Sequence, residues 1–428
     1  MEQNMLLIVY QIEIEIHKFI ADCGRIDPLQ PPVPRLSSPR QTGVITDLLV
    51  ARFLDVFSPD PRFHSDTPRA FRLAASAAVP SRLLYHAFQA VSLALFGKAS
   101  SNKSVERVAG ETYGGVLKDL QRSLYDPEDS KSMEVLITVG LMFIFEGIWK
   151  TDANSVLRHL SGILKLVEHR GPKSHISGID HVFFNDMRFY LVATALTSRK
   201  STLLSTQEWK IIPWSANPET KDVVQLVLDE ALQVPPYLEE YDRFQRALKT
   251  RAPDADIGPL RKALCSRVSK IEQSLYQWYE YWVENYPSGP PSERVPEDES
   301  SFPIFRCRDN SKSTIIVPTV LIYPDVKLAL AHCMFYAVVL IVSANDPREI
   351  RLTGPEEQYD FACRICRSME FCLRTFPGQA VNRLGFPLKV AYSYFPDGIE
   401  REYVKLLSAF IANHRNIRWW DNMKVIYT

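Results

Sequence analysis

The chain has 428 residues, of which 46% are hydrophobic and 23% are charged, and its 50 basic residues balance 50 acidic ones. This composition is typical of a soluble globular protein and excludes a chain that is disordered throughout. A net charge of zero gives the molecule as a whole no field that attracts nucleic acid, and proteins that bind nucleic acid usually carry a basic patch. Composition therefore gives no support to DNA binding.

Cysteine usage and hydropathy indicate an intracellular protein without a membrane anchor. The seven cysteines are odd in number and unevenly spaced, which favours reduced thiols over a secreted disulfide framework. Residues 5–10 are apolar, but an acidic stretch follows and no basic flank or cleavage site of a signal peptide is present. The longest apolar runs, 136–145 and 333–342, are far shorter than the ~20 residues that span a bilayer. We expect them to be buried helices.

The N-terminal part of the chain has no clear helical period. Residues 28–40 contain five prolines and are predicted to form an extended linker. The alternation in residues 11–16 is typical of a strand, whereas the spacing of apolar residues between 12 and 20 also fits a helix. The sequence therefore predicts an N-terminal segment with linker over residues 1–40 and one helical domain over residues 41–428.

After the linker, apolar residues recur almost throughout at the helical spacing of three to four. The first predicted helix begins at Thr46 and ends at Pro59, and a short one follows Asp66-Thr67-Pro68. Pro80-Ser81 begins a helix that extends to about Phe96. The remaining predicted helices cover 103–124, 132–149, 152–170, 180–198, 219–248, 258–286, 324–345, 355–376 and 397–415.

Few other elements are predicted. Gly110, Gly114 and Gly115 interrupt the helical pattern of 103–124 and indicate close packing or a break. Residues 287–301 are polar, acidic and rich in proline, so they should form an exposed loop, and 313–321 is the single plausible strand. The predicted fold is all-α, a bundle of antiparallel helices joined by short loops.

No motif for catalysis or for cofactor binding is present. The sequence lacks the glycine-rich phosphate loops, the GxSxG elbow and the HExxH zinc motif. His159 and His169 lie ten residues apart on one predicted helix, about 80° from each other around its axis, so they cannot share a metal ion. The sequence therefore predicts no catalytic residue, no cofactor and no metal ligand, and a protein that is not an enzyme.

Cys363, Cys366 and Cys372 resemble part of a zinc site. A binuclear cluster needs six thiolates, however, and only three are present here. The same stretch places apolar residues at helical spacing, as one face of a buried helix would. We therefore interpret the three cysteines as packing residues, with a redox-sensitive or partner-facing thiol as the alternative.

Two aromatic segments have a similar ambiguity. Residues 276–286 are rich in tryptophan and tyrosine but hold two glutamates and no basic residue, which favours packing over base stacking. Trp419-Trp420 lies beside arginines and is a candidate for a partner contact, with packing as the favoured interpretation. The carboxylate pairs Glu239/Glu240 and Glu356/Glu357 are expected to be solvated.

One stretch resembles a known family. His159, Gly162, Leu166, Arg170, Gly171 and Pro172 match the H-x-x-G-x-x-x-L-x-x-x-R-G-P signature in the regulatory domain of fungal zinc-cluster transcription factors, the fungal-specific transcription factor domain. The local chemistry agrees with this resemblance. An apolar stripe faces one side, Gly162 permits a close helix approach, and Gly171-Pro172 ends the helix; the stripe comprises Leu157, Leu160, Ile163, Leu164 and Val167.

A second stretch is similar to the same family, in which a helix ends at an arginine and is followed by "EW…PW". The matching residues are Arg199, Glu208, Trp209, Pro213 and Trp214. The resemblance covers residues 45 to 415 and is strongest in 80–215.

The resemblance implies an α-helical, nuclear protein that controls transcription, often of gene clusters for secondary metabolites. In that family an N-terminal six-cysteine cluster binds DNA, but the first 264 residues here hold only Cys23. We therefore expect DNA to be reached indirectly, through other transcription factors or co-regulators, with a small-molecule inducer as a further partner. Pathway regulators of the trichothecene type, which lack the cluster, look similar.

Two alternatives remain open at this stage. The chain could be a fragment of a conventional zinc-cluster activator. It could also be a cofactorless helical enzyme of the terpene-cyclase type, which would need aspartate-rich helix faces to hold magnesium. The nearest acidic runs, 126–129 and 297–299, lie beside prolines at predicted loops, which disfavours the enzyme.

Overall fold

The computed structural model describes residues 39–58, 69–76, 81–151, 154–250, 254–296, 302–309, 314–376 and 378–415. Contacts between residues divide the chain into two units. The first unit holds the described residues up to Leu166, except 69–70, together with Arg415. The second unit holds residues 69–70 and the described residues from Val167 to His414. Residues 1–38 of the predicted N-terminal segment lie outside the described part.

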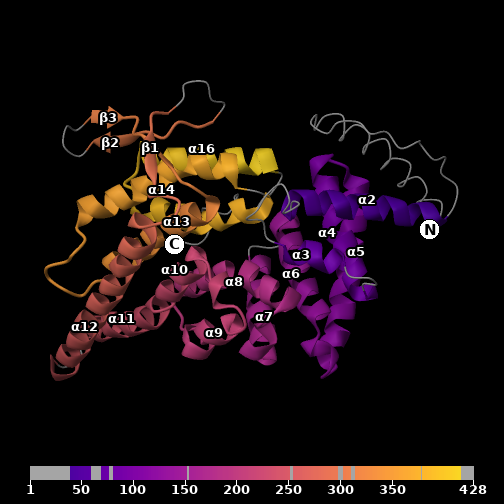
Figure 1. The fold of residues 1–428 in the computed structure, drawn as a ribbon, viewed down its shortest axis with the longest axis horizontal. Coiled ribbons are helices and arrows are strands. Elements are labelled where there is room, and N and C mark those ends of the chain that lie inside the picture. Colours follow the sequence, from indigo (N-terminus) through magenta and orange to yellow (C-terminus); the bar gives the residue numbers. More distant parts are fainter. Residues whose placement is uncertain are drawn as a thin grey trace. The chain divides into compact units, whose positions relative to one another are not determined.

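Among the described residues, six helices contribute to the first unit. Helix α4 packs against α2, α5 and α6 (Figure 1). Serine side chains fix two helix starts: the Oγ of Ser81 accepts from the Leu84 amide at 3.3 Å, and that of Ser132 accepts from the Val135 amide at 3.2 Å. The helices are α2 (Pro39–Phe57), α3 (Ala70–Ala75), α4 (Arg82–Ala99), α5 (Lys103–Tyr125), α6 (Met133–Trp149) and α7 (Ser155–Arg170).

Helix α6 forms the centre of the first unit. Every residue from Val135 to Ile148 is buried, so the helix is apolar on all sides. Helix α5 is unbroken at its three glycines. A Cβ on Gly110 would lie 3.7 Å from the Trp149 ring, an ordinary van der Waals distance, and Gly114 and Gly115 have open space. Close packing therefore requires none of these three glycines.

The second unit is built around α13 (Val326–Ala344), which packs against α10, α12, α14 and α15. Its hydropathy and length would allow it to cross a membrane, and it is the one helix among the described residues that would. However, 83% of its apolar window is buried inside the protein. The second-unit helices also include α8 (Gly178–Ser198), α9 (Gln207–Ile211), α10 (Val223–Ala231), α11 (Val234–Lys249), α12 (Asp254–Tyr279), α14 (Pro355–Thr375), α15 (Gly385–Tyr394) and α16 (Ile399–Arg415).

In the described part of the second unit, four three-residue strands form two antiparallel pairs. Figure 1 shows β1, β2 and β3 near α14 and α16. One pair consists of β1 (Ser292–Arg294) and β4 (Val320–Ile322), and the other of β2 (Cys307–Asp309) and β3 (Thr314–Ile316). In the sequence, β2 and β3 lie between β1 and β4. The prediction of a single strand over 313–321 is wrong, because Pro318 has no amide hydrogen for a ladder and separates β3 from β4. The predicted loop 287–301 contains β1, and its residues 297–301 lie outside the described part.

Helices dominate the described residues, which confirms the predicted all-α class. One boundary prediction is wrong: residues 219–248 form two helices rather than one. Pro235 and Pro236 cannot continue a helix from α10, because each would clash with the carbonyl four residues earlier. Both prolines instead occupy the first turn of α11, where an amide hydrogen is not required.

Two further differences concern helix ends, and a third is an additional helix. Helix α2 begins at Pro39, so the last two residues of the predicted linker are helical. Helix α12 continues as a π-helix over Glu280–Glu284. Helix α15 was not predicted; Pro387 in its first turn and buried Leu388 and Ala391 are the local signals that indicate it.

Candidate functional site

His159 of the family signature lies in a polar network inside the first unit. Its Nε2 is 3.0 Å from the hydroxyl of Tyr113, which donates to Oε1 of Glu146 at 2.6 Å. Glu146 is 1% exposed and also accepts from the amide and hydroxyl of Thr151. The network therefore joins α5, α6 and α7, with a buried carboxylate at its centre.

Burial sets the protonation of this histidine. Desolvation lowers the pKa of His159, against the nearby Glu146 carboxylate, which raises it. The phenol proton of Tyr113 is directed at Glu146, so the Nε2–H of a neutral imidazole is the donor to the phenol oxygen. His159 thus acts as a packed hydrogen-bonding residue.

Gly162 and Leu166 pack α7 within the first unit. A Cβ on Gly162 would lie 3.7 Å from the Val139 side chain, an ordinary van der Waals distance, so α7 and α6 pack together here without requiring a glycine. Leu166 is 8% exposed. In the predicted apolar stripe, Leu157 is an exception because it is 41% exposed.

The end of the signature forms a sharp turn in the second unit. The side chain of Arg170 is 7% exposed and forms an ion pair with Asp180 of α8. Gly171 has a φ of +75° and ψ of 162°, a conformation that is essentially restricted to glycine. Pro172 then begins a short 3-10 turn over Pro172–His175. The sequence prediction that Gly171-Pro172 ends the helix is confirmed.

Trp209 and Trp214 of the second stretch surround Phe184 of α8, at ring-centroid distances of 5.6 and 5.8 Å. His175 lies 5.8 Å from the Trp209 ring and is fully buried, and burial lowers its pKa to about 4. Pro213 is buried as well, whereas Glu208 is exposed. The "EW…PW" residues therefore build an aromatic cluster, with the glutamate outside it.

A buried arginine that the sequence reasoning missed holds this cluster. Arg188 is 0% exposed, lies 4.9 Å from the centre of the Trp214 ring and pairs with Asp229 of α10. Its Nη1 donates to the carbonyl oxygen of Gln225 at 3.0 Å. Asp229 also pairs with Lys221, whose ammonium lies 4.6 Å from the same tryptophan ring.

Arg199 caps the C-terminal end of α8 and has a φ of +57°. Its side chain binds the loop that follows α13. Its guanidinium donates to Asp242 of α11 at 2.5 to 3.1 Å and to Oδ1 of Asn345 at 2.9 Å. The Tyr237 hydroxyl donates to the carbonyl oxygen of the same asparagine. Arg199 of the family motif is therefore a structural clamp between α8, α11 and this loop.

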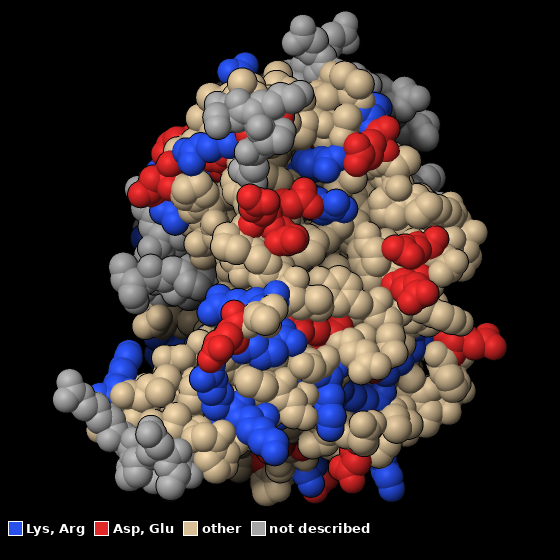
Figure 2. All heavy atoms as spheres, turned by 90° about the vertical axis from the view of Figure 1, so that its left-hand side faces the viewer, with Lys and Arg blue, Asp and Glu red and all other residues tan. Residues whose placement is uncertain are grey.

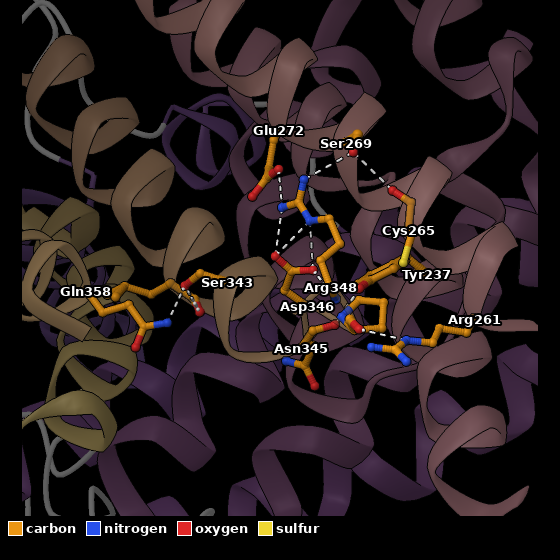
Figure 3. Close-up of polar contacts among 12 residues, drawn as sticks. Tyr237, Arg261, Cys265, Ser269, Glu272, Ser343, Asn345, Asp346, Arg348 and Gln358 are labelled. Carbon is orange, nitrogen blue, oxygen red and sulfur yellow. Dashed lines mark hydrogen bonds and ion pairs between the residues drawn. The ribbon is translucent and has the colours of Figure 1, made fainter. Parts of the chain in front are cut away.

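Figure 3 shows the polar cluster beyond Asn345, in which Arg348 lies between two carboxylates. Its guanidinium contacts Glu272 of α12 at 2.5 Å and Asp346 at 2.7 Å. These hydrogen bonds raise the pKa of Arg348, while burial raises the pKa of Glu272. On the other side of the loop, Arg261 Nε donates to the carbonyl oxygen of Pro347 at 3.2 Å. The cluster holds the α13–α14 loop against α12.

The three cysteines of α14 are packing residues, as predicted. Cys363, Cys366 and Cys372 are at most 5% exposed, and burial raises the pKa of Cys366 and Cys372, so these thiols stay protonated. Cys363 and Cys307 of β2 hydrogen-bond through their thiols. Within the described residues, no group of three or more His, Cys, Asp or Glu side chains is placed to hold a metal ion.

The other sequence candidates have different outcomes. Trp278 is 5% exposed and stacks on Phe335, which confirms packing for that part of the aromatic segment, but Tyr281 is 66% exposed. Asp126 caps an exposed turn through the amides of Glu128 and Asp129, as a loop residue would. Trp419 and Trp420, like residues 297–299, lie outside the described residues.

Charge is less evenly spread over the surface than along the sequence. Figure 2 shows Lys and Arg side chains gathered on the lower half of one face, at the height of α11 and α12 in Figure 1. We call the exposed basic side chains of these two helices the basic face; they are Arg243, Arg246, Lys249, Lys262 and Lys270. A local positive potential therefore exists on a chain whose net charge is zero.

The family motif residues thus serve packing, helix ends and buried ion pairs. They hold one helix against another.

Comparison with known proteins assigns the family. A model described as the fungal specific transcription factor domain matches residues 53–341, which is more than half of the chain. An uncharacterized protein of Emericella nidulans is 28% identical over 126 residues, or 29% of this chain, and the match covers only 27% of that relative's length. No solved structure matches the chain significantly. The description of the family implies a role in the regulation of transcription. The chain belongs to the fungal specific transcription factor domain family.

Proposed function

We propose that this protein regulates transcription in the nucleus through protein partners that its helical surface recruits, rather than through base contacts of its own. The family match over residues 53–341 is the observation that carries this proposal. The zero net charge supports indirect action, because the molecule as a whole has no net attraction for the phosphates of DNA, although the basic face is a local exception. The expected partners are other transcription factors or co-regulators.

The proposed targets are the genes of a fungal secondary-metabolite cluster. This finer assignment rests on the resemblance of residues 159–172 and 199–214 to the family, whose members often control such clusters. A small-molecule inducer that acts on the helical body is part of the same proposal.

Chromatin immunoprecipitation of the tagged full chain tests the proposal. We expect nuclear accumulation, enrichment at promoters only when a DNA-binding partner is present, and altered transcripts on deletion of the gene. A triple variant, Arg243→Gln, Arg246→Gln and Lys249→Gln, separates the two routes to DNA. These side chains are exposed, so the fold should tolerate the changes. Promoter occupancy through a partner that does not use the basic face should survive them.

Two results would contradict the proposal. One is the absence of nuclear accumulation together with unchanged transcripts on deletion. The other is loss of promoter occupancy in the triple variant while partner binding and protein level stay normal, which would indicate direct DNA contact by the basic face.

A further inference from the structure

A cleft of about 790 Å³ opens in the second unit, and residues of α9, α10 and α12 line it. Its volume lies within the range of about 300–1,000 Å³ that is usual for small-molecule sites. Four cations and two carboxylates contribute to its wall: Lys210, Lys221, Arg267, Lys270, Asp229 and Glu230. Cationic side chains therefore outnumber anionic ones in this cleft.

Both carboxylates of the wall are already engaged within the protein. Asp229 pairs with Lys221 and with Arg188, which lies behind the wall. Glu230 accepts a hydrogen bond from Nε2 of Gln233 at 2.6 Å and another from the Ser274 hydroxyl. Asp229 is therefore shared between two cations, and Glu230 forms no ion pair among the described residues. Even with Glu240 on Arg267, cations outnumber carboxylates around the cleft.

Lys210 contributes a half-buried ammonium. Its Nζ donates to the backbone carbonyl of Asp229 at 2.8 Å, a neutral acceptor. Burial lowers its pKa, against the charges of Asp229 and Glu230, which raise it, so these carboxylates only partly offset the lost hydration of the ammonium. An anion placed beside this ammonium would restore the stabilisation.

Arg267 and Lys270 lie on the same face of α12, three residues apart. Arg267 uses one nitrogen for Glu240 at 2.5 Å, and its side chain remains 36% exposed. Lys270 is exposed, and no carboxylate among the described residues forms an ion pair with it. Together with Lys210, these cations approach one hollow from two different elements, α9 and α12.

We propose that this cleft binds a small multivalent anion, a di- or tricarboxylate or a phosphorylated molecule, through Lys210, Arg267 and Lys270. Arginine and lysine are the usual partners of carboxylate and phosphate groups, and the polar wall offers additional hydroxyl and amide groups from Ser205, Gln207 and Gln233. Such a ligand would be the inducer of transcription. The role as inducer rests on the proposed function, whereas the binding of an anion to the cleft does not.

Isothermal titration calorimetry of the purified full chain, with citrate and inorganic phosphate as probes at constant ionic strength, tests the site. Constant ionic strength is needed because salt screens exposed charges. We expect saturable binding of at least one probe, and the preferred probe identifies the source of the negative charge. Lys270→Gln and Arg267→Gln should each weaken binding about tenfold.

Lys262→Gln is the matched control, because Lys262 is an exposed lysine of α12 that does not line the cleft. It should leave the affinity unchanged. Equal weakening by Lys262→Gln, no saturable heat with either probe, or binding of an acidic peptide but of neither small anion would each overturn the proposal. Unchanged transcripts on gene deletion would refute only the proposed function, and absent anion binding only this site.

Discussion

Arg188 is the largest side chain that is completely buried among the described residues. A buried guanidinium is stable only when its partners remain, because desolvation disfavours the charged form. Its hydrogen bonds to Gln225 and its ion pair with Asp229 supply those partners. This arginine therefore connects α8 to α10 beneath the Trp214 ring.

Replacement of Arg188 by methionine should lower the free energy of unfolding by about 3 kcal/mol, as expected when one member of a buried pair is removed. Denaturation in urea measures the change. Arg374→Met is the matched control, because Arg374 is 47% exposed. In both variants the carboxylate partner retains a second ion pair: Glu370 with Arg294, and Asp229 with Lys221. The control should lose less than about 1 kcal/mol. Equal losses would show that burial does not set the cost.

Tyr113→Phe tests the network around His159. The change removes the hydroxyl that donates to the buried Glu146, so we expect a loss of about 1–3 kcal/mol in the free energy of unfolding. Tyr125, on the same helix, is 82% exposed, and Tyr125→Phe should have no measurable effect. Thermal unfolding followed by circular dichroism compares the two. A Tyr113→Phe variant as stable as the control would refute the structural role of this hydroxyl.

His175 predicts a loss of stability in acid. Its folded-state pKa of about 4 lies below the ordinary value of 6.5, so the unfolded chain binds the proton first as the pH falls. Between about pH 6.5 and 4 the unfolded state holds more protons, and the free energy of unfolding should decrease by about 3 kcal/mol. His332, whose pKa burial lowers to about 3, adds a second contribution.

The quantity to measure is the slope of the free energy of unfolding against pH. His175→Phe should flatten it between pH 6.5 and 4, whatever its effect on stability at neutral pH, whereas His169→Phe at an exposed position should leave the slope unchanged. A slope that His175→Phe does not alter would mean that another group governs acid unfolding.

At the scale of the element, Gly171 and Arg199 of the family motif lie at the ends of helices α7 and α8. The backbone of Gly171 occupies a region that other residues avoid, and a Cβ there would meet no neighbour within 4 Å. Gly171→Ala should therefore cost about 1–3 kcal/mol through backbone strain alone. Gly115, inside α5 and also in open space, should show the opposite sign: Gly115→Ala should stabilise by up to about 1 kcal/mol. Chemical denaturation of both variants checks the signs, and a neutral Gly171→Ala would exclude strain.

Helices with local signals could be predicted from the sequence. Ser81 and Ser132 indicate the starts of α4 and α6, because their hydroxyls cap the first turns. Two adjacent prolines, Pro235 and Pro236, divide residues 219–248 into two helices, but the apolar spacing of this stretch alone predicts one. The strand pairing of β1 with β4 could not be predicted, since its partners lie far apart in the sequence and each has only three residues.

The candidate site was predictable only in part. Trp209 and Trp214 were found by resemblance, but Arg188 and Asp229 were not, because the two charges lie 41 residues apart and meet only in the folded protein. A signal for Arg188 exists: it follows Phe184 by four residues, which places a charged side chain on the buried face of α8. A charge at such a position requires a partner elsewhere in the chain.

At the scale of the whole molecule, zero net charge and one basic face predict weak, non-specific affinity for DNA. Any binding by the pure protein should fall steeply between about 50 and about 200 mM salt and show no sequence preference. Gel-shift titrations with promoter and scrambled duplexes at several salt concentrations measure both properties. Tight, sequence-selective retention at physiological ionic strength would contradict indirect action.

Helix α13 also constrains how the chain folds during synthesis. Its partners α10 and α12 leave the ribosome before it, but α14 and α15 emerge afterwards. Until then part of a helix that is apolar on all sides faces water, a condition in which nascent chains aggregate or recruit chaperones. Translation that stops between Asn345 and Gly354 would thus leave a polypeptide that is prone to aggregation. The cellular level of this regulator therefore depends on synthesis of the chain beyond α15.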